Sequence, residues 1–181
     1  MTVFEAIETR RSVRAYESTP LTREQITRFL EAVRLAPSWK DKQCWRILVV
    51  TDREIIRGLG ELLRHNPGKE VYETAPCFVL FFADPALSGV RDEKPYYMTD
   101  IGIAMENAVL AATEMGLGTC WVGALTEAPI KEYLGVPEGL RLVALTPLGV
   151  PAESPDARPR MTTEEFVCHN RWGQPLDLET L

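Results

Sequence analysis

The densest group of basic residues in the chain lies near its N-terminus, where Arg10, Arg11, Ser12 and Arg14 follow a short predicted helix over Val3–Thr9. Guanidinium groups bind phosphate oxygens in a bidentate manner, and a serine hydroxyl adds a further hydrogen bond. This spacing can therefore hold a dianionic monophosphate. The alternative is a solvated charged surface, which the cluster taken alone favours, because runs of charge are usually surface features.

A second polar group lies in residues 36–45, APSWKDKQCW, between a predicted helix and a predicted buried strand. Ser38, Asp41 and Gln43 carry donors and acceptors that can read the edge of a heterocycle, and two tryptophans can form the walls of a pocket. A surface loop anchored by its tryptophans is the alternative, and taken alone it is the more common outcome.

Residues 116–124, GLGTCWVGA, contain three glycines that allow the backbone to approach a ligand closely. These glycines follow a predicted helix and precede a predicted strand, which is the reverse of the order in a dinucleotide-binding fold. The backbone N–H groups of Gly123 and Ala124 remain available as donors. Arg158 and Arg160, in the segment ARPRM, could bind phosphate or could simply be basic residues of a proline-rich tail.

Composition narrows the function classes. The 181 residues carry a formal charge of −6, which argues against broad contact with nucleic acid or an anionic membrane. The four cysteines form no C-x-x-C pair and the two histidines are isolated, so the sequence assigns no metal site and no catalytic side chain.

The start MTVFEAIETRR lacks an apolar signal core, and the longest apolar run is far shorter than the roughly 20 residues of a membrane span. We therefore expect a cytoplasmic protein.

Hydrophobic periodicity predicts one α+β domain over residues 1–181 in which helices and strands alternate. Thr22 and Gln25 form a capping box for the second helix, Asp52 caps the third, and Thr162 and Glu165 form another box near the C-terminus. We expect a mobile surface connection over 86–95, a polar loop over 65–69 and a proline-rich arm after residue 151. The predicted helices cover residues 3–9, 21–36, 99–115 and 126–134, and the predicted strands cover residues 46–51, 77–83, 119–125 and 140–150.

Four segments in this order, RRSVRAY, APSWKDKQCWRILVV, DIGIAMENAVLAATEMGLGTCWVGAL and LGVP followed by ARPRM, resemble the nitroreductase family of FMN-dependent enzymes. The resemblance implies a three-layer fold with a central, mostly antiparallel sheet flanked by helices. It also implies a homodimer with FMN in clefts between the subunits and a domain-swapped C-terminal arm, with Phe166 and Trp172 against the partner. The activity implied is ping-pong hydride transfer from NADH or NADPH to small electron-poor acceptors such as nitroaromatics or quinones.

The resemblance also assigns roles to residues. Arg10, Arg11, Ser12 and Arg14 would hold the FMN phosphate and ribityl chain, and Arg158 and Arg160 would meet the same phosphate. The strand end Val122, Gly123 and Ala124 would run along the flavin, with the Gly123 N–H directed at N5. Ser38, Asp41 and Gln43 would line the flavin edge. The chain departs from the family at Asp41, where asparagine is common, and at Cys44, where proline is frequent.

Two other interpretations stay open. One is a specialised member of the same superfamily, such as a reductive dehalogenase or a flavin-consuming enzyme. The other is a non-enzymatic flavin-binding redox module. For the dimer, we expect residues 99–115 to supply an apolar face made of Ile101, Ala104, Ala108 and Ala111, which a monomer would leave exposed to water.

Overall fold

The computed structural model describes residues 1–63, 66 and 69–178, and its centre is a four-stranded antiparallel sheet. The strand order is β1 (Trp45–Val50), β2 (Cys77–Ala83), β6 (Arg141–Gly149) and β5 (Gly118–Thr119). Strand β2 is buried along its whole length, because it lies between two neighbours and its sequence CFVLFFA has no polar side chain to solvate. Both its position and its bounds agree with the prediction.

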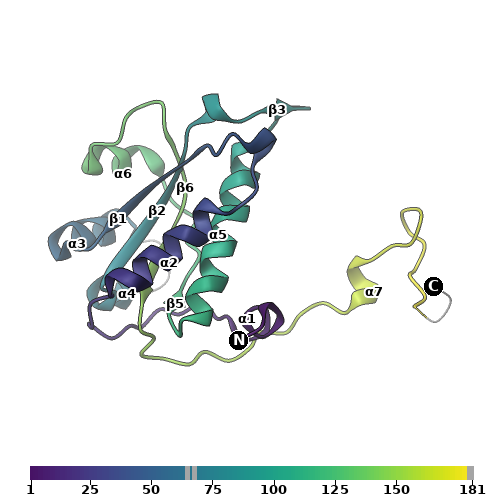
Figure 1. Cartoon of the computed structure of the whole chain (residues 1–181), viewed down its shortest axis with the longest axis horizontal. Coiled ribbons are helices and arrows are strands. Elements are labelled where there is room, and N and C mark those ends of the chain that lie inside the picture. Colours follow the sequence, from purple (N-terminus) through teal and green to yellow (C-terminus); the bar gives the residue numbers. More distant parts are fainter. Residues whose placement is uncertain (64–65, 67–68, 179–181) are drawn as a thin grey trace.

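Helices cover both faces of this sheet (Figure 1). Successive side chains of a strand point to opposite faces, so Val79 and Phe81 pack against α2 (Arg23–Arg34) and α5 (Tyr97–Glu114). Phe78 and Leu80 pack on the other face, in a cluster shared with three other helices. These helices are α3 (Arg53–Leu62), α4 (Lys69–Thr74) and α6 (Glu127–Leu134). The predicted three-layer α+β fold is confirmed.

Local signals place the helix starts as predicted. Helix α1 (Val3–Thr9) has the expected bounds, the Thr22–Gln25 box begins α2, and the Asp52 carboxylate accepts two backbone N–H groups at the start of α3. The predicted Thr162–Glu165 box precedes α7 (Thr163–Phe166). Most of the predicted polar loop over 65–69 lies outside the described residues.

One strand prediction is wrong. Of the strand predicted over 119–125, only Thr119 lies in β5, and Val122 makes one isolated bridge to Leu145, because the Cys120 N–H donates to the Thr146 hydroxyl (3.0 Å) and leaves the ladder. The predicted surface connection over residues 86–95 contains short regular elements. It forms the 3-10 turn η2 (Pro85–Leu87) and a hairpin of β3 (Val90–Arg91) and β4 (Lys94–Pro95).

The expected exposed face of α5 is also corrected. Ile101, Ala104 and Ala108 are completely buried in the chain's own core, since this side of the helix faces α2 and the sheet. Ala111 lines a shallow groove between α1, α2 and α5 together with Val3, and this groove has a volume of about 350 Å³.

The C-terminal segment leaves the body of the molecule after β6 and extends past α1 (Figure 1). Its Phe166 and Trp172 side chains are 64% and 96% exposed, so within one chain they have little to pack against. The single chain does not show a domain swap. Among the described residues, no helix is long and apolar enough to cross a membrane.

Candidate functional site

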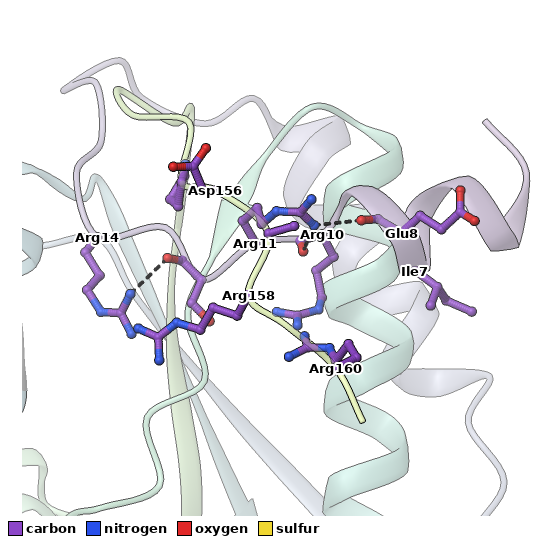
Figure 2. A pocket seen from close by; sticks show the side chains of 11 residues that line it. Ile7, Glu8, Arg10, Arg11, Arg14, Asp156, Arg158 and Arg160 are labelled. Atoms are coloured by element: carbon purple, nitrogen blue, oxygen red, sulfur yellow. Dashed lines mark hydrogen bonds between the residues drawn. The ribbon is translucent and has the colours of Figure 1, made fainter. Parts of the chain in front are cut away.

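Two segments far apart in sequence meet in one pocket of about 360 Å³ (Figure 2). One is the end of α1 with the residues after it, and the other is the proline-rich stretch after β6. All six basic and hydroxyl residues predicted for phosphate binding line this pocket, namely Arg10, Arg11, Ser12, Arg14, Arg158 and Arg160. The predicted phosphate group is thus brought together by the fold.

The charge of this pocket is opposite to that of the whole chain. Five arginines line it against only two carboxylates, those of Glu8 and Asp156, whereas the full sequence carries −6. Several guanidinium groups crowded together repel one another, and a bound dianion relieves that repulsion while accepting charge-assisted hydrogen bonds. The pocket therefore suits a phosphate group.

Backbone carbonyls hold part of this cluster in place. The Arg11 guanidinium donates to the carbonyl of Glu8 (2.6 Å) at the end of α1, where a helix favours positive charge, and Arg14 donates to the carbonyl of Ser12 (3.1 Å). The Glu153 carboxylate accepts the backbone N–H groups of Arg14 and Ala15, which ties the proline-rich stretch to the arginine segment. This tie brings the two halves of the pocket together.

The glycine-containing segment 116–124 runs beside the arginine segment. Ser12 and Thr119 form a parallel bridge, and a side chain at Gly118 would come within 3.0 Å of Val13, so only glycine fits without a shift. Val122 exchanges two backbone hydrogen bonds with Leu145 (2.9 and 3.0 Å), which fixes the following residues.

Gly123 and Ala124 then leave the sheet at an exposed position. Within the described part of the chain no hydrogen bond uses the Gly123 N–H, so it is free to donate to a ligand. The carbonyl of Ala124 accepts from the Asn66 side chain (2.6 Å), which holds the end of this segment. One carboxylate joins the segment to the pocket, since Glu106 accepts from the Trp121 indole (3.1 Å) and lies 3.9 Å from Arg10.

Ser38, Asp41 and Gln43 form a self-bonded loop around η1 (Trp39–Asp41). The Ser38 hydroxyl accepts the Gln43 N–H (2.9 Å), and the Gln43 amide donates to the Asp41 carboxylate (3.0 Å). Lys40, Asp41 and Gln43 all have positive φ angles (48°, 55° and 50°), a conformation that costs on the order of 1–3 kcal/mol per residue outside glycine. The hydrogen bonds within the loop hold its polar side chains in this conformation.

The fold does not bring this loop to the arginine pocket. The Trp39 N–H donates to Asp100 (2.8 Å) in the first turn of α5, whereas Arg10 approaches Glu106, about 9 Å further along the same helix. In Figure 1, α1 lies toward the other end of α5 from the turn that follows α2. One chain therefore gathers the residues predicted to bind phosphate and the glycine segment, but not Ser38, Asp41 and Gln43.

Cys120 lies behind the arginine segment but is not suited to nucleophilic chemistry. Burial raises the pKa of its thiol, although Arg14 and Ser12 favour the thiolate.

Three carboxylates that the sequence analysis did not single out organise the region, namely Asp100, Glu106 and Glu153. The sequence offers one sign of a special role for Asp100 and Glu106, because each is an acidic residue in a mostly apolar predicted helix. It offers no such sign for Glu153.

Comparisons with known proteins identify the family of the chain. The model of the nitroreductase family matches residues 7–73 and 61–150. The protein named FMN reductase (NAD(P)H) of Bacillus subtilis is 31% identical over 184 residues, which cover 92% of this chain and 72% of that protein. A nitroreductase family protein of Clostridium novyi NT has a solved structure with a TM-score of 0.80, 35% identity and 97% coverage of both chains.

A second solved structure is that of the NADPH:FMN oxidoreductase of Vibrio harveyi in complex with NAD⁺. It matches with a TM-score of 0.85 at 28% identity, over 98% of this chain and 80% of that chain. The expected fold class and enzyme class are confirmed by these matches. The chain belongs to the nitroreductase family of NAD(P)H-dependent FMN oxidoreductases.

Proposed function

We propose that this protein binds FMN and uses NADH or NADPH to reduce small electron-poor acceptors, such as quinones or nitroaromatics, in a ping-pong reaction. The observation that carries this proposal is the convergence of five arginines and Ser12 from two distant segments on one pocket of an acidic chain. A pocket of this charge fits a terminal phosphate, which distinguishes FMN from riboflavin.

The residues beside the pocket suit the rest of that cofactor. The Gly123 N–H is exposed and is not used by the described residues, so it can donate to the edge of an isoalloxazine ring. When bound, FMN supplies the hydride chemistry, taking hydride from the nicotinamide and delivering it to the acceptor. The protein then holds the cofactor and stabilises negative charge through the arginines and the Gly123 donor, and no acid or base side chain is needed.

We infer that a second copy of the chain completes the site. The polar loop with Ser38, Asp41 and Gln43 lies away from the arginine pocket of its own chain, so a cofactor that contacts both groups needs the loop of a partner. Exposed apolar side chains on α1 and on the arm support such a dimer, since Phe4 is 75% and Trp172 96% exposed. The arm extends away from the body of the molecule, past α1 (Figure 1).

Steady-state turnover tests the proposal. Purified protein supplied with FMN, NADH or NADPH and a small quinone should oxidise the nicotinamide at a rate proportional to the protein concentration. Double-reciprocal plots of initial rate against nicotinamide concentration, measured at several quinone concentrations, should be parallel if the order is ping-pong. Tight FMN binding without turnover of either nicotinamide would instead support the redox-module interpretation and contradict the proposed enzyme.

A further inference from the structure

A buried carboxylate lies under the strained polar loop. Asp100, in the first turn of α5, is 2% exposed and accepts three hydrogen bonds. Its donors are the Trp39 N–H (2.8 Å), the Ser88 hydroxyl (2.9 Å) and the Cys44 thiol (3.4 Å). Each donor belongs to a different segment, so one side chain joins the loop to the start of the hairpin and to the entry of β1.

These three donors are neutral, and all of them bond to one buried carboxyl group. Burial, followed by the charge of Asp100, raises the pKa of the Cys44 thiol to about 12, so the thiol keeps its proton and remains a donor. Hydrogen bonds that are shielded from water are stronger than exposed ones. The loop is therefore attached at its base by a strong contact, whereas Asp41 and Gln43 at its tip are exposed.

Aromatic contacts complete the attachment. The Trp39 ring lies against the backbone of Gly89, where an added Cβ would come within 2.4 Å of it, and its centroid is 4.4 Å from that of Tyr96. The Tyr96 N–H donates to the Gly89 carbonyl (2.8 Å), which closes the base of the β3–β4 hairpin. Trp39 is thus held between the two ends of the hairpin while Asp100 holds its backbone.

We propose that Asp100 is a positioning residue that holds the 38–43 loop, together with the base of the β3–β4 hairpin, in the conformation that presents Gln43 and Asp41 to the flavin. The proposal rests on the proposed function, because it assigns this loop to the edge of the cofactor. Asp100 does not need to touch the flavin. It acts through Trp39, which precedes the three residues of positive φ.

Limited proteolysis tests the attachment without any cofactor. The loop carries two exposed trypsin sites, Lys40 and Lys42, which become cleavable when it opens locally. In Asp100→Ala, cleavage after these lysines should be at least about tenfold faster than in wild type, and Asp100→Asn, which keeps the shape and one acceptor, should lie between the two. Glu114→Gln is the matched control on α5, since Glu114 is exposed and pairs with Arg28 (3.0 Å) away from the loop.

The pattern of cleavage separates positioning from general destabilisation. We expect cleavage after Lys131, in α6 on the other face of the sheet, to change no more in Asp100→Ala than in Glu114→Gln. Equal acceleration at Lys131 and in the loop, or no acceleration in the loop, would overturn the proposal.

A double-mutant cycle tests the link to the cofactor. The dissociation constant of FMN should rise severalfold in Asp100→Asn, but Asp100→Asn should add little in a Gln43→Ala background, because the two residues act through one loop. Equal effects of Asp100→Asn in both backgrounds would contradict the proposal. A wild-type protein that binds no FMN would instead reject the proposed function, and the trypsin comparison would still decide whether Asp100 holds the loop.

Discussion

Ser12 and Thr119 form a parallel backbone bridge, and the neighbouring Val13 N–H donates to the Thr119 carbonyl at 2.9 Å. This bridge aligns the arginine segment with the glycine-containing segment 116–124. The arginine segment carries the side chains proposed to bind phosphate, and the glycine-containing segment carries the Gly123 N–H. The bridge therefore sets the spacing between two ends of the proposed cofactor site.

We predict that Arg14→Ala and Arg160→Ala each weaken FMN binding at least about tenfold, since each removes a charge-assisted bond of roughly 1.5–3 kcal/mol. Riboflavin, which lacks the phosphate, should bind wild type and both variants with similar affinity. Flavin fluorescence titration measures both ligands. Arg34→Ala is the control, because Arg34 is exposed on α2 and pairs with Glu31. FMN affinity that does not change in Arg14→Ala would reject the phosphate assignment.

The protein should be a homodimer of twice 20.4 kDa by light scattering. Trp172→Ala should raise the dimer dissociation constant, because Trp172 is 96% exposed in the single chain and gains contacts only from a partner. The free energy of unfolding of the separated chain should stay the same. A stable monomer that retains FMN would refute the shared site.

Asp41→Asn should raise the midpoint potential of bound FMN. In the structure the Asp41 carboxylate is bonded to the Gln43 amide, and Lys40 lies over the Trp39 ring, 5.9 Å from its centroid. A carboxylate near the flavin edge opposes the negative charge that reduction adds, whereas asparagine does not. Asp92→Asn, in the β3–β4 turn, is the control. Equal potentials for wild type and Asp41→Asn under anaerobic conditions would show that Asp41 does not tune the flavin.

Stability should fall as the pH rises above about 9. Burial raises the folded-state pKa of Cys77 well above its ordinary value, to about 12, so the unfolded chain loses this proton at a lower pH than the folded chain does. The stabilisation is complete below the unfolded pKa and is lost as the pH rises toward the folded pKa. Urea unfolding at several pH values measures the slope. Cys77→Val should have a shallower slope, and an identical slope in both proteins would contradict the assignment.

The parts predicted from sequence were those with local causes. Helix α1 and strand β2 have the predicted bounds, because a regular helical spacing and an unbroken apolar run each depend only on neighbouring residues. The prediction of a phosphate site came from the clustering of arginines near the N-terminus, and those arginines do line one pocket. The strand predicted over 119–125 was wrong because the Thr146 side chain, distant in sequence, takes the Cys120 N–H.

Long-range contacts explain the other omissions. Asp100 joins three segments, and Glu153 reaches the backbone of Arg14 across the chain, so neither contact could be derived from spacing. The burial of Ile101 and Ala104 likewise depends on α2, which covers the side of α5 that was expected to face a partner.

The proposed function requires that this chain bind FMN in a form that NADH or NADPH can reduce. An anaerobic titration of the FMN-loaded protein with each nicotinamide, followed by visible absorbance, measures this most directly. We expect the absorbance of oxidised flavin to disappear with one equivalent of NADH or NADPH per bound FMN and to return when a quinone is added. Absorbance that persists with an excess of both nicotinamides would contradict it.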